Sequence, residues 1–130
     1  LEIGTGSGYL TAIFSRLSRK VYTMEKFKSL YVLANNNFKK LKLTNIKSKC
    51  VDRFNGWEEE SPFDKIFISV DVNQIDDNII KQLNCNGKFI SPKLSSSGVQ
   101  ILQLFKVDKN KSLSKIEDIC EINFDSFKTL

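Results

Sequence analysis

The 130-residue sequence contains no histidine and only three cysteines. The absence of histidine excludes a Ser-His-Asp or Cys-His catalytic mechanism and any histidine-ligated metal site. Cys50, Cys85 and Cys120 are odd in number and far apart, which argues against a disulfide framework or a paired-cysteine zinc site. This use of cysteine is typical of the reducing cytoplasm, so we expect a cytoplasmic protein without a metal.

Long apolar runs are also missing. No stretch reaches the ~18 apolar residues that a membrane-spanning helix needs, so no membrane association is expected. The net charge is +5, but the positive charges are spread along the chain. The densest basic stretch, residues 39–49, is typical of a solvated helix end, and nucleic acid is therefore the less favoured partner.

Apolar residues alternate between strand and helix spacing up to about residue 92. Strands are predicted over 1–3, 21–25, 46–51, 66–70 and 88–92, and helices over 10–17, 27–43 and 75–83. A turn is predicted at Asn86-Gly87, and two further strands over 99–107 and 119–127 follow with little helix between them. This order predicts an α/β fold, a doubly wound, mostly parallel sheet with an antiparallel C-terminal strand pair, in one domain over residues 1–130.

A glycine-rich turn follows the first predicted strand. Gly4, Gly6 and Gly8 are spaced GxGxG, close to the GxGxxG fingerprint of dinucleotide-binding turns. Glycines at such a turn allow backbone N–H groups to approach a ligand. The spacing alone is a weak signal, and a tight turn without a ligand is the alternative.

Three acidic residues accompany this turn. Glu25 ends the second predicted strand and Asp52 ends the third, so both are expected at the sheet edge where ligands bind in doubly wound folds. There Glu25 would accept hydrogen bonds from a ribose diol, and Asp52 from the amine of an adenine. Glu2 lies within the first strand, where a charge is costly unless it is paired, for example with an ammonium group. Three acids and no lysine in the turn favour S-adenosyl-L-methionine over a pyrophosphate.

Several stretches together are similar to one protein family. Leu-Glu-Ile-Gly-Thr-Gly-Ser-Gly-Tyr at residues 1–9, followed by Val-Tyr-Thr-Met-Glu at 21–25, resembles the protein-L-isoaspartate O-methyltransferases. These are class I S-adenosylmethionine-dependent enzymes with a Rossmann-like fold. The resemblance continues through residues 55–57, 59–64 and 82–92, and it fades after about residue 93.

The resemblance implies S-adenosyl-L-methionine as the cofactor. The residues that it implies in cofactor binding are Glu2, Gly4, Gly6, Gly8, Glu25 and Asp52. It also implies that isoaspartyl-containing (or D-aspartyl-containing) proteins and peptides are the substrates, methylated on a free carboxylate in a repair reaction. A carboxylate is already ionised at pH 7 and needs no general base, which suits a chain without histidine.

Some positions depart from the family's pattern. Val51 and Arg53 flank Asp52 where the family usually has glycines, and Asp71 stands in a segment that is alanine-rich in the family. The family's upstream segment, which carries a hydroxyl residue linked to the acceptor site, does not precede Leu1 in this sequence. We therefore expect an N-terminally incomplete domain, and the catalytic residues stay unassigned.

Two other functions remain open from the sequence. One is a class I methyltransferase with another acceptor such as RNA, which Asp71 and the basic balance motivate. The other is a truncated or decayed, non-catalytic remnant, which the missing upstream segment and the lost glycines beside Asp52 motivate. The protein is expected to be a monomer.

Overall fold

The computed structural model describes residues 1–70 and 76–123. These residues form two compact units that divide between Phe54 and Asn55, and each unit is described by itself. Asp71 lies outside the described residues. Within the described part of the chain, no helix combines the length and apolar character that crossing a membrane requires. The interpretation of residues 1–130 as one domain stays a prediction.

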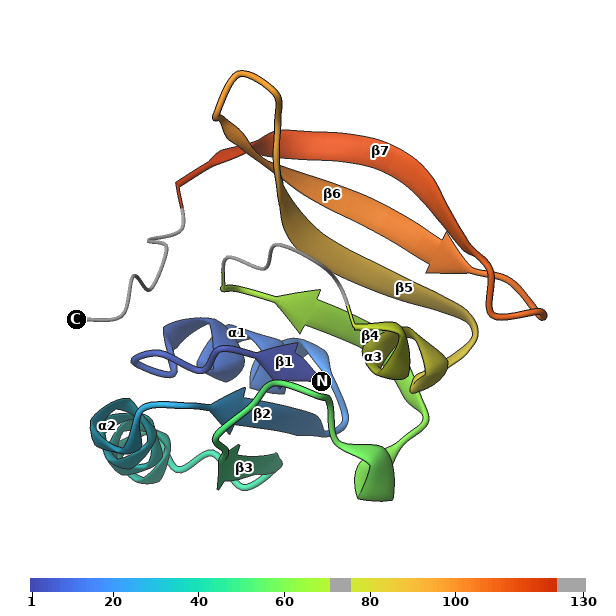
Figure 1. Ribbon diagram of the computed structural model, residues 1–130. Helices are drawn as coiled ribbons and strands as arrows, with labels where there is room; N and C mark the ends of the chain where they lie inside the picture. The colour runs from blue at the N-terminus through green and yellow to red at the C-terminus, as the bar shows by residue number, and fades with distance from the viewer. Residues whose placement is uncertain (71–75, 124–130) are drawn as a thin grey trace. The chain divides into compact units, whose positions relative to one another are not determined.

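The first unit is a parallel sheet with two helices (Figure 1). Strand β2 lies between β1 and β3 and pairs in parallel with both. Each strand and helix of this unit was predicted, with small differences at the ends. The elements in chain order are β1 (Glu2–Ile3), α1 (Tyr9–Leu17), β2 (Val21–Glu25), α2 (Lys28–Lys40) and β3 (Ile46–Cys50).

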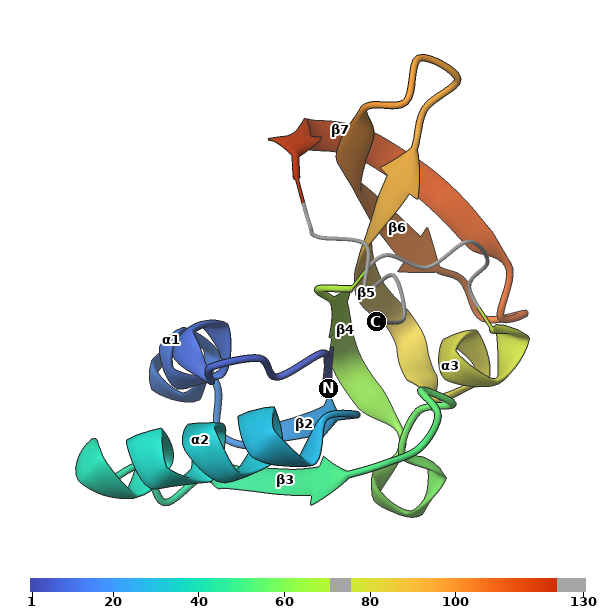
Figure 2. The same cartoon turned by 60° about the vertical axis from the view of Figure 1, so that its left-hand side comes forward.

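The two helices of this unit cover the same face of the sheet. Parallel strands are joined by right-handed crossovers, so two successive crossovers in one direction place both helices on one side. Figure 2 shows α2 running along β3, which it contacts. The buried side chains of Ala34 and Phe38 on α2 lie against Gly8 at the start of α1.

Helix α2 ends earlier than the apolar spacing predicts. Lys42 has a φ of 53°, in the left-handed region that stops a helix. The N–H of Leu43 donates to the carbonyl of Phe38 at 3.0 Å, and that of Lys42 to the carbonyl of Lys39 at 3.0 Å. These two bonds form a Schellman motif, which satisfies the last carbonyls of the helix and turns the chain toward β3.

The second unit contains one parallel strand pair and a long antiparallel ribbon (Figure 1). Strand β4 pairs in parallel with β5, and β5–β6 and β6–β7 pair antiparallel. The predicted antiparallel C-terminal strands are therefore confirmed. The elements in chain order are the 3-10 turn η1 (Glu58–Glu60), β4 (Phe63–Ile68), α3 (Asp77–Lys81), β5 (Leu83–Leu94), β6 (Gln100–Val107) and β7 (Leu113–Ile122).

The predicted turn at Asn86-Gly87 is wrong as a strand boundary, because both residues lie inside β5. Asn86 has a φ of 62°, and the pairing with β4 shifts from Phe63–Leu83 to Lys65–Lys88. The turn-forming residues therefore make a bulge. Strand β5 continues on both sides of this bulge because it pairs with the neighbouring strands β4 and β6. A local sequence pattern does not reveal this pairing.

The start of the predicted last strand at 119–127 is wrong, because β7 runs over Leu113–Ile122, and residues 124–127 of that prediction lie outside the described residues. Its apolar residues recur every third position, at Leu113, Ile116, Ile119 and Ile122, which hides the alternation expected of a strand. Two register shifts against β6 explain this spacing. Each shift adds a residue to β7 and so changes which side chains share a face.

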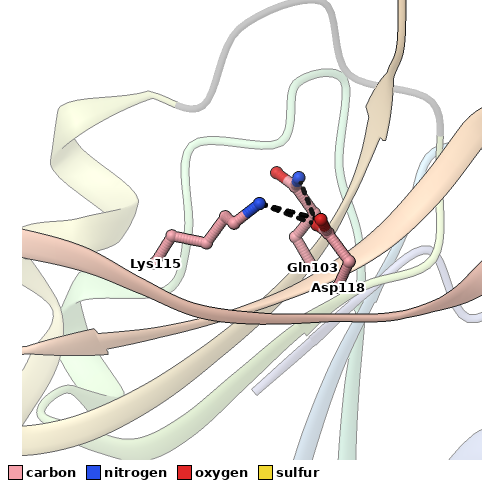
Figure 3. Close-up of polar contacts among 3 residues, drawn as sticks. All are labelled: Gln103, Lys115 and Asp118. Carbon is pink, nitrogen blue, oxygen red and sulfur yellow. Dashed lines mark hydrogen bonds and ion pairs between the residues drawn. The ribbon is translucent and has the colours of Figure 1, made fainter.

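One such shift brings Lys115 and Asp118 of β7 to the same side, together with Gln103 of β6 (Figure 3). Gln103 Nε2 donates to Asp118 Oδ1 at 2.7 Å. Lys115 Nζ donates to both Asp118 oxygens, at 3.0 and 2.9 Å. The hydrogen bond from Lys115 is the main reason that the pKa of Asp118 lies below its usual value. The contact joins two exposed side chains of β7 to the buried Gln103 of β6.

Gln82 fastens the loop that precedes β4. Its Oε1 accepts the N–H of Trp57 at 2.6 Å, and its Nε2 donates to the carbonyl of Asn55 at 3.1 Å. Gln82 and Trp57 are both buried. Gly56 stands between Asn55 and Trp57 in the chain and has a φ of +84°. A Cβ at this position would fall 2.3 Å from Gln82 Oε1. Only glycine leaves space for this contact.

We predict that Gly56→Ala destabilises the protein much more than Gly98→Ala. The matched control has nearly the same φ, +82° against +84°, but nothing lies within 4 Å of its added Cβ. Both substitutions carry the left-handed backbone cost of about 1–2 kcal/mol. Gly56→Ala also displaces a buried hydrogen-bonded amide, which adds about 1–3 kcal/mol. Urea unfolding of the two variants measures the difference, and equal midpoints would contradict the role given to Gln82.

Candidate functional site

The glycine turn after β1 is anchored to the end of β2. The N–H groups of Gly4 and Thr5 both donate to the carbonyl of Met24, at 2.9 and 3.1 Å. The N–H of Gly8 donates to the carbonyl of Thr5 at 2.9 Å. Gly8 is the N-cap of α1. The turn is therefore a defined loop from strand to helix, as the glycine spacing predicted.

Two glycines of the turn have different surroundings. A Cβ at Gly8 would fall 2.5 Å from the ring of Phe38, so this glycine allows α2 to pack closely on the start of α1. A Cβ at Gly6 would meet nothing within 4 Å, although its φ of +56° is in the left-handed region. The open side of the turn is at Gly6, where a ligand has room to approach.

Glu25 points at the glycine turn from the end of β2. Its Oε2 accepts the N–H of Gly6 at 2.8 Å, and its Oε1 accepts the N–H groups of Lys26 and Phe27 at 2.8 and 2.9 Å. Only 2% of the residue is exposed. The sequence placed Glu25 at a strand end beside the turn, and this placement is confirmed.

Asp52 lies two residues beyond the end of β3, which stops at Cys50, and not at the strand end as predicted. Glu25 and Cys50 are opposite in register, and the N–H of Val51 donates to the carbonyl of Glu25 at 2.8 Å. This bond brings the chain leading to Asp52 next to the end of β2. Asp52 itself is exposed.

Glu2 is buried beside β2 and α1, with 1% of the residue exposed. Register pairs Glu2 with Thr23, so their side chains lie on the same face. Thr23 Oγ1 donates to Glu2 Oε2 at 2.6 Å, and Thr11 Oγ1 from α1 donates to the same oxygen. Thr5 Oγ1 lies 2.6 Å from Thr23 Oγ1 and connects this cluster to the glycine turn.

The second oxygen of Glu2 is different. Glu2 Oε1 is buried and has no hydrogen-bond partner among the described residues. Burial raises the pKa of Glu2 from 4.5 to about 7, against the smaller, lowering effect of the Thr11 and Thr23 hydrogen bonds. A buried acceptor of this kind is costly unless a donor or a cation reaches it.

Sequence reasoning missed Thr5, Thr11 and Thr23. The available signal was Glu2 itself, because a carboxylate inside a strand needs nearby donors. The register of β1 and β2 and the packing of α1 decide which hydroxyls supply them, and neither can be read from the local pattern. The described residues contain no cluster of three or more acidic, cysteine or histidine side chains able to hold a metal.

We predict that folding stability falls as pH rises through the window from 4.5 to about 7, the unfolded and folded pKa values of Glu2. In this window the folded protein binds more protons at Glu2 than the unfolded chain does, so raising pH favours unfolding. The effect across the window is about 3 kcal/mol. Glu2→Gln should remove it, and thermal unfolding of both proteins between pH 5 and 8 measures the change.

Glu58→Gln is the matched control for this prediction, because Glu58 is an exposed glutamate. It should keep the pH dependence of the unsubstituted protein. If Glu2→Gln keeps that dependence as well, Glu2 is not the group responsible.

Comparison with known proteins adds the family. Residues 1–125 match the family model described as Protein-L-isoaspartate(D-aspartate) O-methyltransferase (PCMT). A protein-L-isoaspartate O-methyltransferase of Caulobacter vibrioides is 38% identical over 124 residues, which are 95% of this chain and 55% of that protein. The chain spans about half the length of the curated relatives that it matches.

Solved structures agree with this match. One protein-L-isoaspartate O-methyltransferase has a TM-score of 0.85 and 32% identity, over 96% of this chain and 40% of that chain. A Plasmodium falciparum protein described as a beta-aspartate methyltransferase, in complex with S-adenosyl-L-homocysteine, has a TM-score of 0.71 and 26% identity, over 95% of this chain and 64% of that one. The predicted α/β class with a mostly parallel sheet is confirmed. The chain belongs to the protein-L-isoaspartate(D-aspartate) O-methyltransferase family.

Proposed function

We propose that this chain is the cofactor-binding part of an S-adenosyl-L-methionine-dependent methyltransferase. Its substrate is the free carboxylate of L-isoaspartyl or D-aspartyl residues in damaged proteins, and its action is repair. The observation that carries this proposal is the family match over residues 1–125. The geometry of the glycine turn and its acidic neighbours supports the same cofactor.

The fit to the cofactor is best at Glu2. Its partnerless Oε1 is buried, and S-adenosylmethionine carries an ammonium group that would satisfy such an oxygen. Thr5 and Thr23 link this carboxylate to the glycine turn by hydrogen bonds. We therefore assign Glu2 to the methionine part of the cofactor.

Glu25 and the turn fit the nucleoside part. A carboxylate offers about four acceptor positions, and three backbone N–H groups occupy part of this capacity at Glu25. The remaining capacity, on the oxygen that binds Gly6, suits a ribose hydroxyl. Asp52 is assigned to the adenine amine, because the segment before it is bonded to the end of β2. The turn that completes the site consists of Gly4, Gly6 and Gly8.

The chemistry needs little acid–base assistance from the protein. The bound cofactor supplies a methyl group on a sulfonium, whose leaving group is a neutral thioether. The acceptor carboxylate is already ionised at pH 7. The chain therefore contributes binding and orientation, and we assign no catalytic residue to it.

The cell compartment is part of the proposal. Cys50, Cys85 and Cys120 are all free and exposed, a state that the reducing cytoplasm preserves. We therefore propose a cytoplasmic protein. Its monomeric state stays a prediction.

We predict that the protein containing this chain transfers a methyl group from labelled S-adenosylmethionine to an isoaspartyl peptide. We expect no transfer above background to the matched normal aspartyl peptide. The free carboxylate of the isoaspartyl linkage is the feature that distinguishes the two substrates. Scintillation counting of the extracted methyl ester measures the transfer.

Three other outcomes would contradict this function. Equal labelling of the two peptides would remove the isoaspartyl specificity. Labelling of RNA in place of peptide would favour the alternative acceptor. The absence of both labelling and S-adenosylhomocysteine binding would favour a non-catalytic remnant.

We predict that Glu25→Gln weakens S-adenosylhomocysteine binding by at least about tenfold, which corresponds to about 1.4 kcal/mol. The amide places an N–H₂ where an oxygen now accepts backbone N–H groups, and it removes the charge-assisted bond to ribose. Isothermal calorimetry measures the affinity. Glu60→Gln is the control, and equal affinities for the two variants would exclude Glu25 from the site.

A further inference from the structure

We propose that Thr11 and Thr23 are positioning residues for cofactor binding. Their hydroxyls hold one oxygen of the Glu2 carboxylate and leave the other available to the ammonium group of the cofactor. This inference rests on the proposed function, and it adds two residues that neither the glycine spacing nor the acidic pattern identifies.

Hydroxyl chemistry fixes the direction of the hydrogen bonds in this cluster. Thr23 has one hydroxyl hydrogen, and it is donated to Glu2 Oε2 at 2.6 Å. The bond between Thr5 and Thr23, 2.6 Å long, must then have Thr5 as its donor. The chain Thr5 to Thr23 to Glu2 therefore runs in one direction, and each bond polarises the next.

The two clamping hydroxyls come from different elements. Thr23 lies on β2, opposite Glu2 in the sheet, and Thr11 lies on α1 above it. Both are 0% exposed and both donate to Oε2, so the carboxylate is held from the strand and the helix at once. Oε1 is left buried without a partner. This asymmetry suits the carboxylate to ligand binding, because a fully paired carboxylate would have no buried acceptor left for a ligand.

The charged groups that act on Glu2 are few. The charged side chain that acts on it is the carboxylate of Glu25 on β2, which raises the pKa of Glu2. Helix α1 carries one charged side chain, Arg16, in its last turn. The hydroxyls of Thr11 and Thr23 lower the pKa of Glu2 through their hydrogen bonds, and each effect is larger than the raising effect of Glu25. They are therefore the main groups that keep Glu2 ionisable at neutral pH against its burial.

A pH dependence of binding follows from this arrangement. The ammonium group attracts the ionised form of Glu2, so the apparent affinity scales with the fraction of protein in that form. With a Glu2 pKa of about 7, S-adenosylhomocysteine should bind about tenfold more tightly at pH 8 than at pH 6. Loss of either hydroxyl should raise the pH at which this change in affinity (the affinity step) occurs.

The experiment compares Thr11→Val and Thr23→Val with Thr11→Ser, which keeps the hydroxyl. Thr44→Val is the matched control, because Thr44 is exposed in the loop before β3. The first readout is the ¹³C carboxyl shift of Glu2, titrated by NMR without ligand. The second is the affinity for S-adenosylhomocysteine by calorimetry from pH 6 to 8.5.

We expect the Glu2 titration and the affinity step to move upward together in both valine variants, and to stay in place in the serine and Thr44 variants. If the Glu2 titration does not move in the valine variants, Thr11 and Thr23 do not position Glu2, and the proposal (the Thr11–Thr23 clamp) is overturned whatever the methylation activity. A titration that moves while the affinity stays independent of pH overturns the contact between Glu2 and the ammonium group.

Glu2→Gln keeps the test decisive if a valine variant fails to fold. This variant should bind the ligand weakly and without a pH step, and a step that persists in it overturns the proposal. Methyl transfer to the isoaspartyl peptide is measured separately. Transfer by the unsubstituted protein together with an unchanged Glu2 titration rejects the clamp alone, whereas absent binding and absent transfer reject the proposed function as well.

Discussion

The carboxylate of Glu25 is the contact on which the first unit depends. Its two oxygens accept N–H groups from Gly6 in the glycine turn and from Lys26 and Phe27, which lead into α2. The carbonyl of the same residue accepts the N–H of Val51 at the end of β3. One residue thus joins the ends of three segments that are far apart in the sequence. The geometry of the turn follows from this connection, because the anchored loop holds Gly6 with its open side outward.

Glu2 illustrates a different constraint. Its carboxylate is enclosed by sheet and helix, and the fold provides two hydroxyl donors to one oxygen and none to the other. An arrangement with an unsatisfied buried acceptor costs stability, which is why such groups are rare and occur at functional sites. Under the proposed function, the ammonium group of the cofactor would satisfy the oxygen that folding leaves without a partner.

The second unit is stabilised by different means. In the loop before β4, the side-chain amide of Gln82 makes hydrogen bonds of the kind that a neighbouring strand would supply. It bonds to the backbone of Asn55 and Trp57, on both sides of Gly56. Along the ribbon of β5, β6 and β7, bulges repeatedly change which side chains share a face. They permit Asn86 inside a strand and place Lys115 beside Asp118, so local periodicity is a poor guide in this region.

Sequence alone determined the class of fold, the alternation of strands and helices in the first unit, and the position of Glu25 beside the glycine turn. These features depend on local periodicity and on the rule that parallel strands end at one edge. Tertiary structure alone decided that Gly8 accommodates Phe38, that Thr11 and Thr23 hold Glu2, and that β7 begins at Leu113. Each of these depends on the register between strands or on the packing of a helix, and such contacts join residues whose separation along the chain leaves no local pattern.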